Sequence, residues 1–436
     1  MTMPAAEHEE PARRSMGGVK AGAIVLVGVV LANSGNYVFQ VIAARYLGPS
    51  PYGDLATLLV LGGLIGLPLG GLQVWVARHV AEYEAVGDRE ATRWFIRRVL
   101  LYTSAVAAGA TVLFVALSPV IRDLLGISTL SGVAVNGLIT IPAVVTPVVW
   151  GLAQGLQRFS LISFTVASAP IVRIALAAMT FGLGFGVTGA IAATLVSNSI
   201  TLLFPLWILR SWLVPAPAPH DRIQRGEAVR SLLPVLLGLL AITALTSVDV
   251  IVAKAALGKH QAGIYGSASL IGRVILYLPT AIITVLLPRV AARAARDEHS
   301  LDILGLSALV TLAFCTVATL FYAAVPDEIV KIAFGAKYAE AAPLLWRFGV
   351  SMTGFALLNV LLVYDLGRRG LKVAWLLAAG AAAQIVTFLA LHGSDLTLVD
   401  IDVVFAVLLL IAHEVLTRGT LIRAGGAGVK ALARRG

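Results

Sequence analysis

Hydrophobic residues dominate the chain in long continuous runs that short polar segments separate. Each run is about twenty residues long, the length that a helix needs to cross the hydrocarbon core of a bilayer. Polar and apolar positions do not alternate within them, which favours helices over a β-barrel. The predicted spans lie near 21–44, 55–77, 98–120, 131–154, 160–181, 187–209, 230–253, 262–287, 302–324, 343–365, 371–391 and 400–422.

Composition agrees with an all-α integral membrane protein of about twelve transmembrane helices. Hydrophobic residues make up 58% of the 436 residues and charged residues only 13%, with a mean hydropathy of +0.91. A soluble domain carries about 25% charged residues. The first run follows Arg13, Arg14 and Lys20 as in a signal peptide. Because no small-residue cleavage site closes a short apolar core there, we interpret it as a retained first span.

The basic residues lie mainly in short loops between the apolar runs, where they set membrane orientation. The net charge of +10 therefore does not indicate nucleic-acid binding, and we expect no nucleic-acid partner. If the N-terminus is cytoplasmic, most of the 33 Lys and Arg residues lie on the inner side. The outer loops then hold only Arg45, Arg122, Lys254, Lys259, Lys331 and Lys337. This asymmetry predicts that both termini are cytoplasmic.

One polar segment divides the chain into two halves of six spans each. It contains Pro215, Pro217 and Pro219 together with several charges, which is typical of a linker. The predicted parts are a cytoplasmic N-terminal tail (1–20), an N-terminal six-helix bundle (21–210), a cytoplasmic linker (211–229), a C-terminal six-helix bundle (230–423) and a basic cytoplasmic tail (424–436).

The two halves resemble one another. Leu47-Gly48 and Tyr52-Gly53 follow the first span, and Leu257-Gly258 and Tyr265-Gly266 follow the seventh. An even number of spans in each half places the second half in the same orientation as the first. This predicts two pseudo-symmetric bundles related by an axis along the membrane normal, with a site at their interface near the midplane. Such an arrangement suits alternating access by rocking one bundle against the other.

Three arginines lie within predicted spans. Arg173 and Arg273 are near mid-span, one in each half, and Arg347 is nearer an outer end, where it can snorkel. A charge at the bilayer centre costs from about 2.5 to above 10 kcal/mol, so it faces a partner or a wet cavity. Guanidinium groups bind phosphate in a fork. The pattern favours a site for the phosphate or pyrophosphate of a lipid carrier, although pairing with an acid or a helix carbonyl would also explain it.

Other polar residues within the spans have two readings each. Asp249, near the outer end of its span, is a candidate for coupling to protons or sodium, and equally for a salt bridge. Amide side chains can hydrogen-bond sugar hydroxyls or join helices. The candidate amides are Asn33, Asn36 and Gln40 of the first span and Gln73 of the second.

The sequence indicates no enzyme activity, cofactor or metal site. The segment 184–189 fits G-x-G-x-x-G, but it joins two membrane spans and lacks the strand and helix of a dinucleotide site, so it is a turn. No P-loop lysine motif occurs. The single cysteine, Cys315, excludes an intramolecular disulfide and a Cys-based metal cluster.

Several motifs resemble those of bacterial polysaccharide exporters, the Wzx-type oligosaccharide flippases. The first-loop run from Ala44 to Pro49, with Tyr52-Gly53, resembles their signature in that loop. Matching motifs follow in order over about residues 20–425. They are Gly151-Leu152, Gln154-Gly155, Gln157-Arg158-Phe159, Val248-Asp249-Val250-Ile251, Ala262-Gly263-Ile264-Tyr265, Leu287-Pro288, Phe334-Gly335 and Tyr338.

This resemblance implies a V-shaped pair of six-helix bundles, similar to the MATE drug exporters and the lipid II flippase MurJ of the MOP superfamily. It implies a substrate of the undecaprenyl-pyrophosphate-linked oligosaccharide type, flipped from the inner to the outer face of the bacterial cytoplasmic membrane for polysaccharide or lipopolysaccharide biosynthesis. Membrane lipids, a polysaccharide polymerase and glycosyltransferases are the implied partners. Family members carry cationic residues in the cavity, in agreement with Arg173 and Arg273. MurJ has fourteen spans, which argues against lipid II as the substrate here.

Two other functions stay open at this point. An ion-coupled, MATE-like exporter of small molecules should line its cavity with acids and aromatic residues, whereas the deep charges expected here are arginines. A membrane enzyme of polysaccharide synthesis would need a large outer domain. The predicted outer loops are no longer than about twenty residues and leave little room for one.

Overall fold

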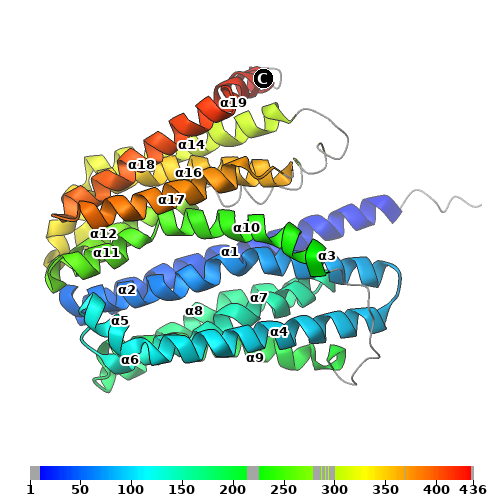
Figure 1. Cartoon of the computed structure of the whole chain (residues 1–436), viewed down its shortest axis with the longest axis horizontal. Helices are drawn as coiled ribbons and strands as arrows, with labels where there is room; N and C mark the ends of the chain where they lie inside the picture. Colours follow the sequence, from blue (N-terminus) through cyan, green and yellow to red (C-terminus); the bar gives the residue numbers. More distant parts are fainter. Residues whose placement is uncertain are drawn as a thin grey trace, which may run out of the picture.

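The computed structural model of the chain describes residues 10–213, 225–277, 286, 290, 293, 300–368 and 370–433. Within these residues the secondary structure is helical, without a strand. Figure 1 shows the long helices side by side along one direction, with the first and last described residues toward the same end of the molecule. We call the opposite end, where α1 ends and α2 and α12 begin, the distal end.

The N-terminal half contains nine α-helices and a short 3-10 turn inside its second span. They are α1 (Glu10–Leu47), α2 (Pro49–Gly66), η1 (Leu67–Leu69), α3 (Gly70–Ala85), α4 (Arg89–Ala116), α5 (Ser118–Leu125), α6 (Leu130–Leu138), α7 (Thr140–Gly155), α8 (Phe159–Gly182) and α9 (Gly186–Ile208), followed by η2 (Arg210–Trp212).

The C-terminal half repeats this order and adds a final helix. Its elements are α10 (Arg225–Leu245), α11 (Val248–Ala256), α12 (Lys259–Tyr277), α14 (Leu301–Ala324), α15 (Pro326–Ala333), η3 (Ala336–Leu344), α16 (Leu345–Gly367), α17 (Lys372–Ala390), α18 (Asp395–Leu416) and α19 (Thr420–Ala433).

The predicted all-α membrane architecture is confirmed. Among the described residues, nine helical segments are long and apolar enough to cross a membrane, and the pair α10–α11 makes a tenth. Together with α1 and α12, these segments form about twelve spans. Apolar side chains also cover the lipid-facing surface, as with Leu101 (69% exposed) and Val112 (70% exposed) on α4. An exposed apolar surface of this kind suits a hydrocarbon solvent.

Three predicted spans contain breaks that the hydrophobic pattern did not reveal. The turn η1, which contains Pro68, separates α2 from α3, and Ile139 separates α6 from α7. Thr246 and Ser247 separate α10 from α11, whose axes differ by 42°. Proline lacks the N–H that would continue a helix, which explains the first break. The length of an apolar run shows that a segment can cross the membrane, but it does not show whether the helix is interrupted within the run.

The internal repeat is visible in two short helices at the distal end. After the third span of each half comes an eight-residue helix with a proline in its first turn, α5 in one half and α15 in the other. Gly126 follows α5 at φ 58°, and Gly335 follows shortly after α15 at φ 90°. Glycine is the residue that adopts such angles without strain. The two halves therefore turn at equivalent places in the same way.

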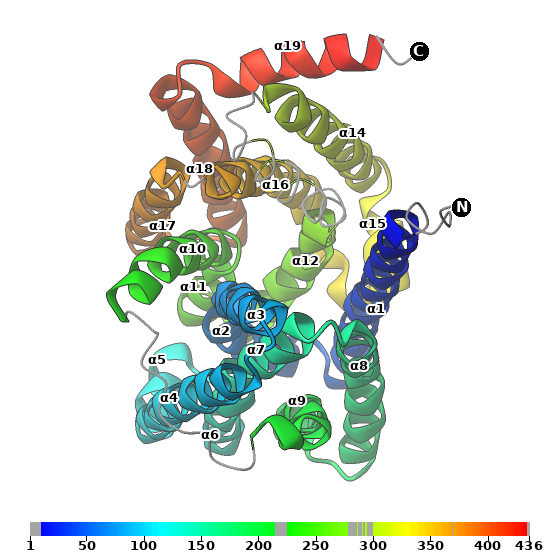
Figure 2. The ribbon, with the colours of Figure 1, turned by 90° about the vertical axis from the view of Figure 1, so that its right-hand side faces the viewer.

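Helix packing divides the protein into two bundles. In the N-terminal half α8 packs against α1 and α9, and α7 packs against α3, α4 and α9; in the C-terminal half α16 packs against α12, α14 and α18. The bundles meet chiefly through α2, which packs along α12 and also touches α10 and α11. The end-on view in Figure 2 shows α2 and α3 next to α10–α12 at the centre of the molecule.

The predicted C-terminal tail (424–436) is helical as far as the structure describes it, to Ala433, as part of α19. Glycines permit its close packing on α14. A β-carbon on Gly305 would lie 1.8 Å from the carbonyl oxygen of Ala424, so these two backbones are in direct contact. The carboxylate of Glu414 accepts hydrogen bonds from the backbone N–H groups of Leu421 (2.8 Å) and Ile422 (3.2 Å) and caps the start of α19.

We predict that Gly305→Ala detaches α19 and lowers stability by about 1–3 kcal/mol, because the added methyl overpacks the contact with Ala424. Limited proteolysis of detergent-purified protein should then remove the C-terminal helix faster, and the thermal midpoint should fall. Gly425→Ala is the matched control, since a β-carbon there meets no atom within 4 Å. Equal proteolysis of the two variants would contradict the packing argument.

Candidate functional site

A cavity lies at the junction of the two bundles, and we call it the seam cavity. Its volume is about 130 Å³. The N-terminal bundle contributes side chains from α1 and α2, and the C-terminal bundle contributes side chains from α10, α12 and the region where α10 gives way to α11. The lining residues are Gln40, Ala56, Leu59, Val60, Gly63, Thr243, Ser247, Val250, Gly266, Leu270 and Arg273. A site between the bundles is what the repeat predicts.

Arg273 supplies the positive charge of the seam cavity. Its Nη2 donates a hydrogen bond to Oδ1 of Asp249 at 3.2 Å, within an ion pair between α12 and α11. The Arg273 side chain is 18% exposed and that of Asp249 is fully buried. A guanidinium has five N–H donors, and this bond uses one of them. Arg273 can therefore keep its acid partner and still present donors to an anion in the cavity.

The C-terminal bundle contains a second buried acid in addition to Asp249. Asp402 on α18 accepts a hydrogen bond from Nε2 of Gln384 on α17 at 2.8 Å, and both side chains are buried. The same Nε2 donates to the carbonyl oxygen of Leu245 at 3.3 Å, where the break after α10 removes a helical hydrogen bond. Ser269 donates to Oδ2 of Asp249 at 3.4 Å.

We call Asp249 and Asp402 the acidic pair. Oδ2 of Asp402 and Oε1 of Gln384 have no hydrogen-bond partner within the described residues. A buried charge without a cation partner is expensive, so either protonation of Asp402 or a bound cation would lower the cost of burying the acidic pair. Asp249 was singled out from the sequence, whereas Asp402 and Gln384 were not. The sequence did contain a signal for these two residues, because Asp402 and Gln384 are polar side chains within otherwise apolar runs.

The second predicted arginine, Arg173, does not line the seam cavity. It projects from α8 toward α1, where its guanidinium carbon lies 5.3 Å from the centre of the Phe39 ring. No carboxylate pairs with it in the part of the chain that the structure describes, and its Nε–H lacks an acceptor there. Cation–π contacts of this kind contribute about 0.5–2 kcal/mol. Among the described residues, no acid neutralises the charge of Arg173 inside the N-terminal bundle.

Arg347 lies within the C-terminal bundle and away from the seam cavity. Its Nε donates to Oδ1 of Asp400 on α18 at 2.9 Å, and its Nη1 donates to the carbonyl oxygen of Pro343 at 3.1 Å. The guanidinium carbon also lies 4.6 Å from the centre of the Trp346 ring. These contacts connect α16 to α18.

The four predicted amides fall in different places. Gln40 lines the seam cavity. Asn33 and Asn36 lie on the same helix and are partly exposed, and Oδ1 of Asn36 has no hydrogen-bond partner among the described residues. Gln73 donates from Nε2 to Oε1 of Gln154 at 3.0 Å and so connects α3 to α7 within one bundle.

This arrangement of two helical bundles also occurs in membrane proteins of known structure. An inward-facing MATE-family multidrug resistance transporter of the MOP superfamily superimposes with a TM-score of 0.69 at 16% identity, covering 94% of this chain and 98% of that one. An outward-facing structure of a MATE-family multidrug resistance transporter gives 0.61 at 18% identity, covering 94% and 96%. The lipid II flippase MurJ, in an inward closed conformation, gives 0.73 at 11% identity, covering 93% and 90%.

The polysaccharide biosynthesis protein family matches residues 19–292, more than half of the chain, and the chain belongs to this family. No curated protein shows significant sequence similarity to the chain. The chain is thus a multi-pass membrane protein of the polysaccharide biosynthesis protein family that shares the fold of these MATE-family transporters and of MurJ.

We predict that Arg273 and Asp249 depend on one another for stability. Arg273→Gln leaves a buried carboxylate without its cation and should cost about 3–5 kcal/mol. Adding Asp249→Asn removes that charge and should restore much of the loss. Thermal unfolding of the single and double variants in detergent forms a double-mutant cycle. Purely additive losses would show that the two side chains do not interact.

Proposed function

We propose that the protein flips an undecaprenyl-pyrophosphate-type lipid-linked oligosaccharide from the inner to the outer face of the bacterial cytoplasmic membrane, for synthesis of a cell-surface polysaccharide or lipopolysaccharide. The supporting observation is a cation, Arg273, in a cavity between two bundles, beside the amide of Gln40. Membership of the polysaccharide biosynthesis protein family and the fold shared with a lipid II flippase favour this substrate class.

The chemistry of the cavity suits the polar end of such a lipid. Pyrophosphate carries several negative charges, and a guanidinium binds it through paired hydrogen bonds. Gln40 can hydrogen-bond sugar hydroxyls, and Asn33 and Asn36 continue a polar stripe along α1. A cavity of about 130 Å³ is too small for an oligosaccharide. Transport therefore requires the bundles to separate on one side at a time, which is alternating access.

The proposed orientation follows from charge. We place both termini in the cytoplasm and the distal end at the outer face, because the sequence segments on the side of the termini hold most of the basic residues. Arg173, on the helix next to α1, would add a second positive charge for a headgroup that enters the N-terminal bundle. Polysaccharide polymerase and glycosyltransferases remain the expected partners.

Ion coupling is a second part of the proposal. Asp249 neutralises much of the Arg273 charge that would attract the substrate phosphate, although the guanidinium still has free donors. Proton or sodium binding to the acidic pair would neutralise Asp249 and free Arg273 for the anion. Buried acids also occur in the alternative function, an ion-coupled exporter of small molecules. Neither acid lines the seam cavity whereas Arg273 does, so the cavity favours an anionic substrate.

We expect Arg273→Ala in an Asp249→Asn background to abolish flipping of a fluorescent undecaprenyl-pyrophosphate-linked oligosaccharide in proteoliposomes. Asp249→Asn alone is the reference, so the comparison isolates the lost anion contact without leaving an unpaired carboxylate. Arg122→Gln, at a partly exposed arginine on α5, is the control for loss of a positive charge. Flipping by the double variant at the rate of the reference would refute the proposed role of Arg273.

Coupling predicts that Asp249→Asn and Asp402→Asn uncouple flipping from imposed proton or sodium gradients. Each removes one ionisable group of the acidic pair while keeping a side chain of similar size. The flipping assay is run with and without each gradient, and Asp123→Asn, an exposed acid on α5, serves as control. Full activity and an unchanged gradient response in both variants would exclude this coupling site.

A further inference from the structure

At the distal end the two bundles touch backbone to backbone. A β-carbon on Gly263, near the start of α12, would lie 1.8 Å from the carbonyl oxygen of Pro49, at the start of α2. A β-carbon on Gly53 would lie 2.9 Å from the backbone nitrogen of Gly263. Any larger side chain at these two glycines would force the helices apart. The contact therefore closes the space between the bundles on the distal side of the seam cavity.

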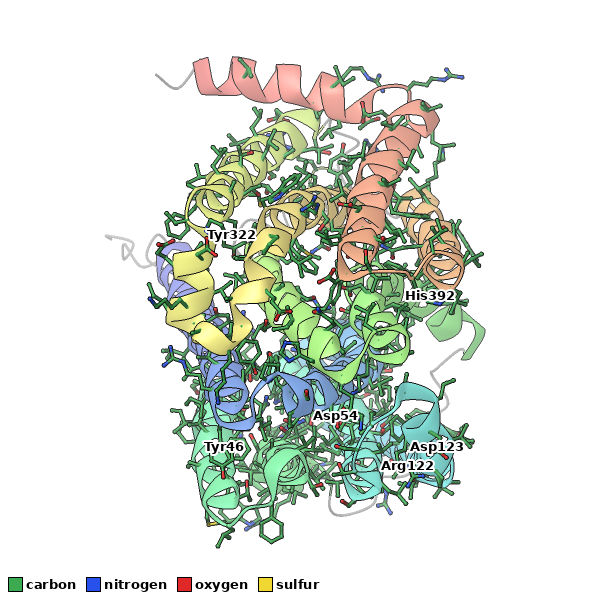
Figure 3. The ribbon with its side chains drawn as sticks, turned by 90° about the vertical axis from the view of Figure 1, so that its left-hand side faces the viewer. Tyr46, Asp54, Arg122, Asp123, Tyr322 and His392 are labelled. Carbon is green, nitrogen blue, oxygen red and sulfur yellow. The ribbon has the colours of Figure 1, made fainter. Side chains whose placement is uncertain are left out.

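A buried ion pair crosses between the bundles next to this contact. Nζ of Lys254 on α11 lies 2.5 Å from Oδ1 of Asp54 on α2, and the two side chains are 1% and 2% exposed. Oδ2 of Asp54 accepts hydrogen bonds from the backbone N–H of Ser128, at 3.0 Å, and from its hydroxyl group. Figure 3, which views the molecule from the distal end, shows Asp54 near the centre, where ribbons of both halves meet.

Further contacts around this centre also join the two halves. Nε of Arg45, at the end of α1, donates to the carbonyl oxygen of Ala333 at 2.9 Å, at the end of α15. The hydroxyl of Tyr338 donates to the carbonyl oxygen of Ala44 at 2.8 Å. The ring of Tyr52 lies 6.0 Å from the ring of Tyr338 between centroids. We call these contacts, together with the glycine contact and the Asp54–Lys254 pair, the distal seal.

Three of the motifs that carry the family resemblance contribute to the distal seal. The first-loop motif supplies Ala44, Arg45, Tyr52 and Gly53, the motif at 262–265 supplies Gly263, and the motif at 334–338 supplies Tyr338. Asp54 directly follows the first of these motifs, and Lys254 follows the motif at 248–251 by three residues. The substrate site described above does not use these contacts.

A buried ion pair between moving bodies has two favourable states. With the bundles together, each charge has its partner; with the bundles apart, water solvates both charges. A partly open state that separates the ions without admitting water is costly. We propose that Asp54 and Lys254, with the Gly53–Gly263 contact, form the outer gate of the transporter and that this gate is closed here. The proposal rests on the proposed function, which places the distal end outside.

The gate agrees with the position of the seam cavity. Ala56 and Val60 line the cavity directly beyond Asp54 along α2, so a reagent from outside must pass the distal seal to reach them.

The test measures access to the cavity from outside. In a Cys315→Ser background, Val60→Cys places a single thiol in the cavity wall, and a membrane-impermeant maleimide is added to right-side-out vesicles. Asp54→Asn should raise the labelling rate about tenfold or more, because the unpaired Lys254 favours the open, hydrated state. Asp123→Asn, an exposed acid at the same end of the molecule, should leave the rate unchanged.

Neutralising both partners separates a gate from general damage. Lys254→Gln alone should raise labelling as Asp54→Asn does, whereas the double variant Asp54→Asn/Lys254→Gln should label more slowly than either, because no unpaired charge remains. The assignment is overturned if both single variants, present in the membrane at normal amounts, label at the parent rate. It is also overturned if Asp123→Asn raises labelling equally.

A steric variant tests the gate without changing any charge and decides the matter if the charge variants fail to fold. Gly263→Ala should wedge α12 away from Pro49 and raise labelling of the cavity thiol. Gly258→Ala, in the turn directly before α12, is the matched control, since a β-carbon there meets no atom within 4 Å. Equal labelling of the two alanine variants would count against the gate.

Labelling requires no substrate, so the gate and the proposed function can fail separately. Faster labelling in the gate variants of a protein that does not flip the lipid-linked oligosaccharide would keep the gate and reject the substrate. If flipping is normal but none of the gate variants changes the labelling rate, the proposed function stands and the gate is rejected.

Discussion

Lipid favours charges that are paired with an opposite charge, and the placement of the ion pairs in this protein decides which contacts a bundle movement must break. Arg273 pairs with Asp249 and Arg347 with Asp400, in each case inside the C-terminal bundle. Among ion pairs between described residues, only Asp54–Lys254 connects the two halves. A rigid rotation of one bundle against the other keeps the first two pairs and breaks the third. The cost of motion is thus concentrated at the distal end.

The same constraint gives Arg273 its dual character. Inside the membrane an arginine without a partner is expensive, so Asp249 stabilises it when the cavity holds no anion. Under the proposed function, an arriving phosphate would replace or supplement that acid, and the acid would in turn need a proton or cation. The break between α10 and α11, next to Asp249, leaves the carbonyl of Leu245 for Gln384, which also binds Asp402. Irregular backbone at a membrane site therefore contributes to the polar cluster.

The fold was predictable because lipid permits few alternatives: apolar runs of sufficient length become helices, and an internal repeat implies two bundles. That Arg273 faces a partner and a cavity was also predictable, since a mid-span charge without either is costly. Its partner was not, because sequence cannot show which of several acids lies across a helix pair. Asp54 and Lys254 lie near predicted span ends and read as ordinary interfacial residues. Their burial results from the packing of α2 against α11 and α12, which no local pattern encodes.

Pseudo-symmetry brings the second spans of the two halves together at the distal contact. The second span of each half occupies the equivalent position, so α2 and α12 approach one another across the axis that relates the bundles. Gly53 and Gly263 meet at this crossing, and only residues without a β-carbon permit direct backbone contact. Close packing without interdigitated side chains can be separated and re-formed without repacking. Glycine at the crossing and a charge pair beside it thus give a contact that is tight when closed and readily hydrated when open.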